Sequence, residues 1–278
     1  MKERMKISAT IKDQLQVNRF VVPYRVYGNS GPHLVCLNGI QQSMAMWHSF
    51  IRRFSSSYRI VLFDFPGQGK GHVLSGPTKT SLEEEVEILE EVIKGTGVND
   101  ITLCTASWGG VVAMMFAERH PPIVRRLILG SLGTRANKQM ADIIQSGSQI
   151  DPNDRGKISD SLINCFGQNL PDVIKRKIMK QFAEMSQERL AAFCEHGLFI
   201  IDGKNLRDVV NFKGIQAETI LLRGENDTIV DLDDVQYLTS QIPNCRMEIV
   251  QGVGHFLHLE TDDVLDIYCK ILPQVETN

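Results

Sequence analysis

An alternation of short apolar runs with helical patterns is the feature that most constrains the fold of this chain. The runs are continuous, rich in Val, Ile and Leu, and bounded by turn residues; they occupy 33–39, 59–65, 100–106, 125–131, 218–224 and 246–252. Such runs are typical of strands that are buried on both faces, as in a parallel sheet. A further strand is predicted at 19–28, where Pro23 favours an edge position because proline has no N–H to donate.

Helical patterns stand between these runs. Ser81 and Glu84 have the spacing of a capping box, and the helix that they begin runs to a glycine-rich stop. Further helices are predicted at 109–122, 231–243 and 261–275. The alternation predicts a right-handed, doubly wound α/β architecture.

One segment interrupts this rhythm. Between about Thr134 and Asn211 there is no strand pattern, and helical patterns occur at 170–185 and 188–202. We therefore expect a core formed by 1–133 and 212–278, with a helical lid inserted at 134–211. The lid offers large apolar side chains that suit an apolar ligand, although any lid needs such residues to pack: Met140, Ile143, Ile144, Phe166, Phe182, Met185, Phe193 and Phe199.

Composition narrows the function classes. The 278 residues carry a net charge of −3 with both signs mixed, which argues against nucleic acid or an anionic membrane surface as a partner. The six cysteines include no C-x-x-C pair, so neither a metal site nor a redox motif is predicted, and reduced thiols favour a cytoplasmic location. No signal peptide and no apolar run of about 18 residues is present, so we expect no membrane span.

The stretch "LCTASWGG" at 103–110 indicates a strand that turns sharply into a helix with Ser107 at the apex. The nucleophile elbow of this kind has the pattern G-x-S-x-G, and here Thr105 takes the place of the first glycine. Threonine is small, but its β-branch makes the turn less easy than glycine does. The alternative role of Ser107 is that of a helix N-cap.

Polar residues also follow two later strands: Asp227 follows 218–224, and His255 follows 246–252. Function in an open α/β sheet collects at the carboxyl ends of the strands. A serine hydroxyl needs an adjacent base, and a buried carboxylate fixes the imidazole tautomer. We therefore predict a catalytic triad of Ser107, His255 and Asp227, with Glu225 as the second choice of acid and His258 as a rival histidine that packs or lines the rim.

The oxyanion hole requires two backbone N–H groups. Trp108, which follows the nucleophile, supplies one, and the loop after 33–39 supplies the other, with Ile40 as the first choice and Gln41 in reserve. Gln41 and Trp47 are candidate substrate-binding residues. Trp47, with Met44 and Met46, equally suits the core face of the first helix.

Two basic or glycine-rich stretches have simpler explanations. "PGQGKGH" at 66–72 lacks the residues of a phosphate-binding loop and predicts a turn near the pocket. "KRK" at 175–177 favours a solvated helix face, with the docking of an acidic carrier protein as the alternative.

The motifs "LNGIQQS", "FDFPGQGKG", "ASWGG", "GENDTIV" and "GVGHF" occur in the order of the α/β-hydrolase superfamily, which the chain resembles over nearly its whole length. This resemblance implies a mostly parallel eight-stranded sheet with helices on both faces and a helical lid. "VLFDFPGQGK", "EEEVEILEEVI", "TASWGG" and "GHFLHLE" also resemble the enzymes that make 3-(3-hydroxyalkanoyloxy)alkanoic acids for rhamnolipids and the 3-hydroxyacyl-ACP:CoA transacylases. Those families likewise lack glycine two residues before the serine.

The narrower resemblance implies serine-dependent acyl transfer from a 3-hydroxyacyl or fatty acyl thioester, with acyl carrier protein or CoA as a possible donor and without a cofactor. The triad leaves the acceptor open, because water, a hydroxyl and a thiol can all attack an acyl-enzyme. The alternatives are a carboxylesterase that acts on a small or medium apolar ester, and a non-catalytic ligand sensor on the same fold.

Overall fold

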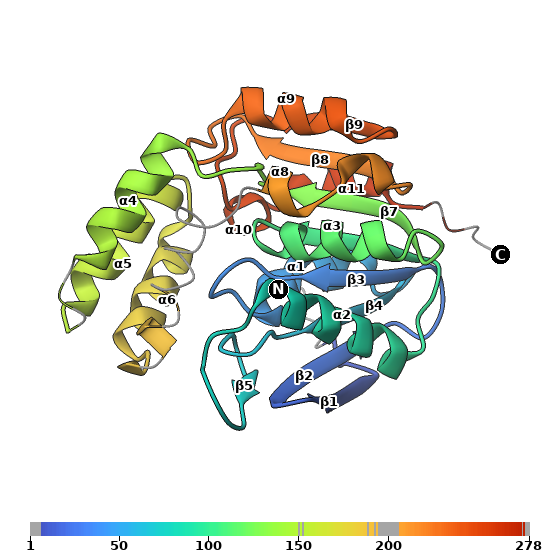
Figure 1. The fold of residues 1–278 in the computed structure, drawn as a ribbon, viewed down its shortest axis with the longest axis horizontal. Helices are drawn as coiled ribbons and strands as arrows, with labels where there is room; N and C mark the ends of the chain where they lie inside the picture. Colours follow the sequence, from blue (N-terminus) through green and yellow to red (C-terminus); the bar gives the residue numbers. More distant parts are fainter. Residues whose placement is uncertain are drawn as a thin grey trace, which may run out of the picture.

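The computed structural model describes residues 7–149, 151, 153–187, 189–191, 193, 206–273 and 275. Its centre is a sheet in the strand order β1-β2-β4-β3-β6-β7-β8-β9, with β5 paired to β2 beside this path (Figure 1). The strands are β1 Ile11–Val17, β2 Phe20–Tyr27, β3 His33–Leu37, β4 Arg59–Phe63, β5 His72–Val73, β6 Ile101–Ala106, β7 Val124–Gly130, β8 Glu218–Gly224 and β9 Cys245–Val250. Neighbouring strands in the part of the sheet ordered β4-β3-β6-β7-β8-β9 are parallel. Strand β2 pairs antiparallel with β1, β4 and β5. The expected mostly parallel α/β sheet is confirmed, but the described residues form nine strands instead of eight, because the two-residue β5 also pairs with β2.

The predicted edge position of the strand with Pro23 is wrong, because β1 pairs along the whole outer side of β2. Pro23 lies opposite Gln14 of β1, and its carbonyl accepts a hydrogen bond of 3.1 Å from the N–H of Asp64 on the other side. The missing N–H of a proline is tolerated here because opposed residues of an antiparallel pair alternate between bonded and non-bonded positions. The edge strand is β1, whose side chains are mostly exposed.

Helices cover both faces of the sheet and build two apolar cores. On one face, α2 Leu82–Thr96, α3 Gly109–Arg119, η2 Phe212–Gly214 and α9 Leu232–Gln241 pack on the sheet. On the other face lie η1 Met44–Trp47, α1 His48–Phe54, α10 Leu257–Glu260 and α11 Val264–Ile271. Alternate residues of a buried strand serve the two cores: Val35 of β3 joins the first core, and its neighbours Leu34 and Cys36 join the second.

The predicted capping box begins α2. The Ser81 hydroxyl accepts from the Glu84 N–H at 3.2 Å, and the Glu84 carboxylate accepts from the Ser81 N–H at 2.8 Å. Gly97 ends the helix with a φ of +64°, a left-handed conformation that glycine adopts easily. The helix is thereby fixed at both ends, and it packs against α3 and β1.

The inserted segment stands apart from the sheet at the carboxyl ends of the strands (Figure 1). It contains α4 Lys138–Ser148, α5 Arg155–Phe166 and α6 Asp172–Ala183, and α8 Leu206–Val209 follows it. Its own small core includes Ile158, Phe182, Met185 and Leu190. Leu206 packs in the core on the α2 side of the sheet, so we propose that the lid ends before Leu206 rather than at residue 211.

The two ends of this lid meet. The N–H of Leu206 donates to the carbonyl of Thr134 at 3.0 Å. The buried Asp234 carboxylate of α9 accepts from the Thr134 backbone and hydroxyl and also pairs with Arg207 at 2.7 Å. The Arg207 guanidinium lies 3.7 Å from the centroid of the Tyr237 ring. One carboxylate therefore ties both stems of the lid to the core. Among the described residues, no helix has the length and apolarity that a membrane-spanning segment needs.

Candidate active site

Ser107 lies at the turn between β6 and α3 with a backbone φ of +46°. This left-handed conformation is uncommon for a residue with a side chain and is tolerated where the surroundings enforce it. Here the N–H of Ser107 donates to the carbonyl of Gly130 at 2.7 Å, and its own carbonyl accepts from Gly110 at 2.8 Å. The strand-to-helix elbow predicted from the sequence is present.

Two glycines after Ser107 explain how the elbow tolerates Thr105. A Cβ added at Gly109 would lie 2.7 Å from the carbonyl oxygen of Leu37, so α3 approaches β3 closely at this point. A Cβ added at Gly110 would lie 3.2 Å from the hydroxyl of Thr105 and 2.7 Å from a methyl group of Leu132. Glycine at position 110 thus makes the room that glycine at position 105 would otherwise make.

Asp227 and His255 form a buried pair. Nδ1 of His255 lies 2.9 Å from Oδ2 of Asp227, and Oδ1 of Asp227 accepts from the N–H groups of Ile229 at 2.9 Å and Val230 at 3.1 Å. Burial alone would raise the pKa of Asp227, but the interaction with His255 and the two backbone bonds outweigh it and lower this pKa. The carboxylate therefore stays charged beside the imidazole.

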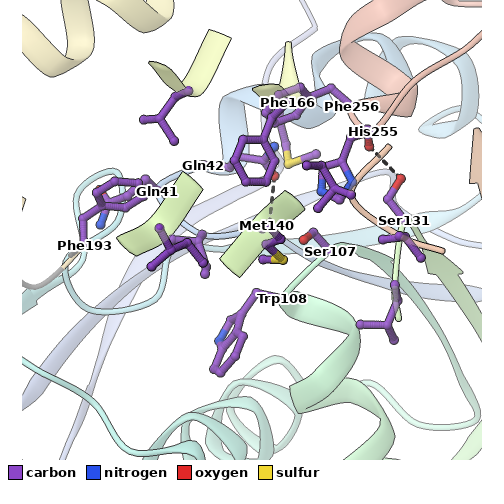
Figure 2. A pocket seen from close by; sticks show the side chains of 18 of the residues that line it. Gln41, Gln42, Ser107, Trp108, Ser131, Met140, Phe166, Phe193, His255 and Phe256 are labelled. Carbon is purple, nitrogen blue, oxygen red and sulfur yellow. Dashed lines mark hydrogen bonds between the residues drawn. The ribbon is translucent and has the colours of Figure 1, made fainter. Parts of the chain in front are cut away.

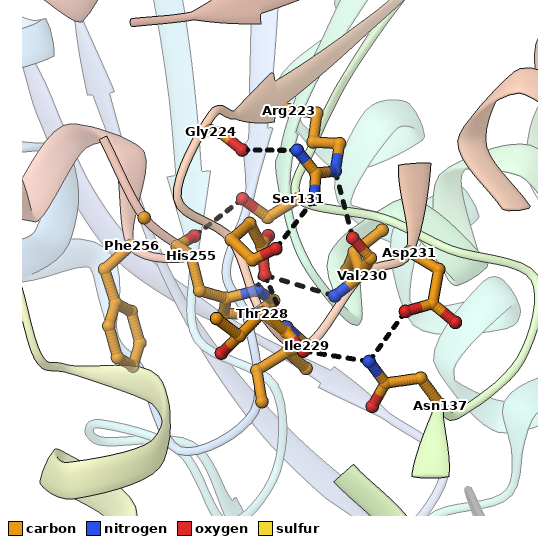
Figure 3. Close-up of polar contacts among 12 residues, drawn as sticks. Ser131, Asn137, Arg223, Gly224, Thr228, Ile229, Val230, Asp231, His255 and Phe256 are labelled. Atoms are coloured by element: carbon orange, nitrogen blue, oxygen red, sulfur yellow. Dashed lines mark hydrogen bonds and ion pairs between the residues drawn. The ribbon is translucent and has the colours of Figure 1, made fainter. Parts of the chain in front are cut away.

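Arg223 braces the loop that carries Asp227 (Figure 3). Its guanidinium donates to the carbonyls of Asp227 at 2.7 Å, Gly224 at 2.9 Å and Val230 at 3.0 Å. Asn137, just before α4, donates to the carbonyl of Thr228 at 2.8 Å. These donors fix the backbone between β8 and α9. Arg223 lies inside an apolar run of the sequence, and no local pattern marks this role.

Ser131 is a second serine in a left-handed conformation, with a φ of +52° at the end of β7. Its hydroxyl donates to the backbone carbonyl of His255 at 2.6 Å, and its N–H donates to Leu222 at 2.8 Å. Ser131 therefore ties the histidine loop to the centre of the sheet. Ser131 was not among the residues predicted for the site, although it follows an apolar run as Ser107 does.

Ser107 and His255 open into one cavity of about 420 Å³. Figure 2 shows the Ser107 hydroxyl below the His255 ring, with Trp108 beneath and Phe166 beside the imidazole. The lining includes Ile40, Gln41, Trp108 and Met46 from the core. The apolar side chains of the lid that line it are Met140, Ile144, Ile158, Leu162, Phe166, Ile174, Ile178, Phe182 and Phe193. A cavity of this size and lining suits an apolar ligand.

The lid contacts the candidate catalytic residues directly. The Phe166 ring of α5 lies edge-on to the His255 ring, with centroids 5.7 Å apart. Gln181 of α6 donates at 2.8 Å to the carbonyl of Gln41, whose φ is +56°. Arg189 donates at 3.1 Å to the carbonyl of Gly67, so the 66–72 turn contacts the lid.

Trp47 does not line the cavity, so its prediction as a substrate-binding residue is wrong. Its indole is fully buried between the sheet and α10, where it donates to Asn38 at 2.9 Å and packs on the His258 ring at 4.8 Å. Burial lowers the pKa of His258 to about 4, and this histidine packs in the core as expected. Glu225, the second choice of acid, is exposed and accepts from the Gly252 N–H at 2.9 Å.

Other predicted residues are placed as follows. Gln41, Ile40 and Trp108 all line the cavity. Met185 packs inside the lid core. Phe199 and the side chain of Ile143 lie outside what the structure describes. Within the "KRK" stretch, Lys175 donates to the carbonyl of Gln168 at 3.0 Å, and the exposed Lys177 reaches the cavity lining.

The chain is similar to known enzymes over most of its length. It is 23% identical over 239 residues to an (R)-3-hydroxydecanoyl-ACP:CoA transacylase of Pseudomonas aeruginosa, covering 84% of this chain and 79% of the relative. It is 25% identical over 261 residues to a pimeloyl-[acyl-carrier protein] methyl ester esterase of Nitrosospira multiformis, covering 84% and 91%. The carboxylesterase CesB of Bacillus subtilis superposes with a TM-score of 0.77 at 20% identity, covering 95% and 91%.

These relatives support an enzyme of the hydrolase or acyltransferase type. The family model for the alpha/beta hydrolase fold matches residues 32–262, which include the elbow, the acid loop and the histidine loop. The chain therefore belongs to the α/β-hydrolase family.

Proposed function

We propose that this enzyme transfers acyl groups through a covalent acyl-enzyme on Ser107. The observation that carries the proposal is the shared cavity, in which the elbow serine and the Asp227-paired His255 face an apolar volume of about 420 Å³. The Ser107 hydroxyl attacks the acyl carbonyl carbon while Nε2 of His255 takes its proton. Asp227 holds Nδ1–H and stabilises the imidazolium that forms.

The oxyanion of the tetrahedral intermediate requires donors that are already in place. We assign this role to the backbone N–H groups of Ile40 and Trp108. The Gly39 N–H donates to Oε1 of Gln42 at 2.8 Å, which supports the turn that carries Ile40. Collapse of the intermediate breaks the C–S or C–O bond, and His255 returns its proton to the leaving thiol or alcohol. The acceptor then attacks the acyl-enzyme by the reverse sequence.

The proposed donor is a 3-hydroxyacyl or fatty acyl thioester of medium length. The apolar lid side chains in the cavity support an acyl chain, and the transacylase of Pseudomonas aeruginosa supports the thioester class. A second cleft adjoins the cavity and shares Lys177 and Gln181 with it. Its other lining residues are Lys180, Glu184, Met185 and Arg189. Three cations against one carboxylate in this cleft favour the phosphate of CoA or of an acyl carrier protein over a neutral head group.

A carboxylesterase that acts on an apolar ester is the second candidate. The esterase of Nitrosospira multiformis supports it, and the same triad serves both reactions because only the leaving group and the acceptor differ. Gln41 borders the cavity and stays a candidate for substrate contact in either case.

Mass spectrometry with a 3-hydroxydecanoyl thioester tests the proposal, with intact protein and released products recorded together. We expect an acyl adduct on the native enzyme, no adduct on Ser107→Ala, and an unchanged adduct on Ser161→Ala, which removes another cavity hydroxyl. A hydroxyacyl ester or an exchanged thioester identifies a transferase, and free acid alone identifies a thioesterase. Absence of any adduct, alongside fast cleavage of a short p-nitrophenyl ester, would reject the thioester and leave the carboxylesterase.

A further inference from the structure

A buried carboxyl group lies behind the candidate active site. Glu85, in the first turn of α2, is only 2% exposed. Its Oε2 accepts from the indole N–H of Trp108 at 2.7 Å, and its Oε1 accepts from the hydroxyl of Thr80 at 2.8 Å. The proposed acyl transfer makes no use of this group, yet it bonds the side chain of the residue that follows Ser107.

Trp108 has two roles at the site. Its backbone begins α3 and supplies one of the proposed oxyanion donors, and its side chain lines the cavity beside Leu82 and Val111. An indole ring has two side-chain torsions, so a hydrogen bond at its far end together with packing fixes both. Figure 2 shows this ring extending away from Ser107 toward the base of the site. Glu85 holds the ring at that end.

We propose that Glu85 is a positioning residue of this enzyme, which fixes the Trp108 indole and thereby both the cavity wall and the oxyanion donor next to Ser107. This inference rests on the proposed function. Glu85 does not itself line the cavity, and its two side-chain hydrogen bonds join it to Trp108 and Thr80, so it acts through Trp108 and the helix start. Loss of its bond is therefore expected to lower turnover more than substrate affinity.

The ionised form of Glu85 is the one that suits two donors. A carboxylate accepts from Trp108 and Thr80 at once, whereas a protonated carboxyl must turn one O–H toward a partner. The Thr80 hydroxyl can rotate to accept a hydrogen bond from this O–H, but the indole N–H can only donate. Protonation of Glu85 therefore weakens the charge-assisted hydrogen bond to Trp108. Burial raises the pKa of Glu85 to about 7, with the bonds from Trp108 and Thr80 opposing the rise and the charge of Glu84 adding to it.

Other charges near Glu85 are already engaged. Glu84, its neighbour on α2, pairs with Arg19 of the β1–β2 turn at 3.0 Å. Arg119 of α3, the helix packed against α2, pairs with Glu83 at 2.6 Å. Among the described residues, neither Arg19 nor Arg119 forms an ion pair with Glu85. The pKa of Glu85 is therefore set mainly by burial and by its two neutral donors, Trp108 and Thr80.

The tryptophan fluorescence of the full chain tests the proposal without any need for activity. The sequence has two tryptophans, and Trp47 lies in the other core, away from Glu85. We expect a fluorescence transition near pH 7 in the native enzyme that disappears in both Glu85→Gln and Trp108→Phe. It should persist in His255→Gln and in Ser107→Ala, so that failure of the proposed catalysis leaves this signal intact.

Kinetics complete the test. We expect Glu85→Gln to lower kcat about tenfold, the effect of one weakened hydrogen bond to a charged group, with a smaller change in KM. In a Trp108→Phe background the same substitution should cause no further loss, because the contact through which Glu85 acts is gone. Native kcat in Glu85→Gln, full additivity of the two changes, or a pH transition that survives Glu85→Gln would each overturn the proposal.

Thr80→Val provides a second probe if Glu85→Gln does not fold. It removes one donor to the carboxylate and keeps the indole bond, so the transition should move to higher pH. An unmoved transition would show that Glu85 is not its source and would reject the assignment.

Discussion

The hydroxyl of Ser131 donates a 2.6 Å hydrogen bond to the backbone carbonyl of His255, and it thereby joins the end of β7 to the loop that follows β9. These two residues are far apart in the chain, and the intervening strand β8 separates their strands in the sheet. The bond sets the height of the imidazole above the sheet without contacting the ring.

Ser131→Ala is therefore expected to lower kcat about three- to tenfold, because a lost buried hydrogen bond leaves a carbonyl unpaired and a small displacement of a base is expensive. Steady-state ester or thioester cleavage measures the effect. Ser159→Ala is the matched control, since its hydroxyl makes a 2.9 Å bond to Gly156 inside the lid. Equal losses in the two variants would argue against a role of Ser131 in placing His255.

Asp227→Asn should reduce kcat by several orders of magnitude, about 10⁴-fold by analogy with other triads, because an amide at this position favours the wrong imidazole tautomer. Glu225→Gln, which alters an exposed carboxylate two residues away, should leave kcat within about twofold. Stopped-flow measurement of acylation separates the chemical step from product release. A mild effect at Asp227 would move the acid role to another residue.

Asp234→Asn is expected to loosen both stems of the lid at once. The carboxylate is 3% exposed and holds Thr134 and Arg207, and weakening a buried charged pair of this kind costs about 2–4 kcal/mol. We expect faster hydrogen exchange in the described part of the lid and a lower unfolding temperature. Asp233→Asn, on the exposed side of the same helix turn, should change neither. Unaltered exchange in Asp234→Asn would show that the lid is held elsewhere.

Glu85 should make the enzyme less stable as the pH rises. Its pKa is about 7 in the folded chain against an ordinary value of 4.5. The folded state therefore binds the proton that the unfolded state has released, and stability falls between about pH 4.5 and 7. A shift of this size corresponds to about 3 kcal/mol. Urea titrations at several pH values give the free energy of unfolding of the native enzyme and of Glu85→Gln. We expect this free energy to fall with rising pH more steeply in the native enzyme. The same pH dependence in both proteins would contradict the prediction.

His258 should make the enzyme less stable as the pH falls, the opposite of the effect of Glu85. Burial lowers its pKa from 6.5 to about 4, so the unfolded chain binds the proton first and stability falls as the pH drops from about 6.5 to 4. His258→Phe keeps a ring among Trp47, Phe50 and Tyr268 and should remove about 3 kcal/mol of this acid sensitivity. Denaturation at pH 4.5 and at pH 7 measures the difference. An acid response unchanged by the substitution would assign it to other groups.

The sequence predicted the parts of the fold that local pattern controls. Buried parallel strands have continuous apolar runs, and the capping box at Ser81 and Glu84 specifies a helix start. Strand β1 lacks such a run, because polar residues interrupt its apolar ones and most of its side chains are exposed at the edge. Because β1 was not predicted, Pro23 indicated an edge position for β2, which in fact has β1 beside it.

The residues of the candidate site also fall into those that a local sequence pattern predicts and those that it does not. Ser107, Asp227 and His255 each follow a recognisable strand, and the structure brings Asp227 to His255 and places Ser107 in the same cavity; their catalytic roles stay predictions. The bond of Glu85 to Trp108 joins two segments that are distant in the sequence, and the bonds of Arg223 depend on how the next seven residues fold back on its side chain. No local sequence pattern reveals either contact. Trp47 was equally compatible with a pocket and a core, and only its three-dimensional neighbours decide that it is core.

The hydrogen bond between the Leu206 N–H and the Thr134 carbonyl has a consequence for how such a protein diversifies. The chain leaves the core at Thr134 and re-enters it at Leu206, directly beside the point where it left. Strands β7 and β8, which flank the insertion in the sequence, pair with each other in the sheet. The entropy of closing a longer loop grows only slowly with its length. Different lids can therefore be inserted into one α/β core between Thr134 and Leu206. Substrate preference can then change while Ser107, Asp227 and His255 keep their places in the core.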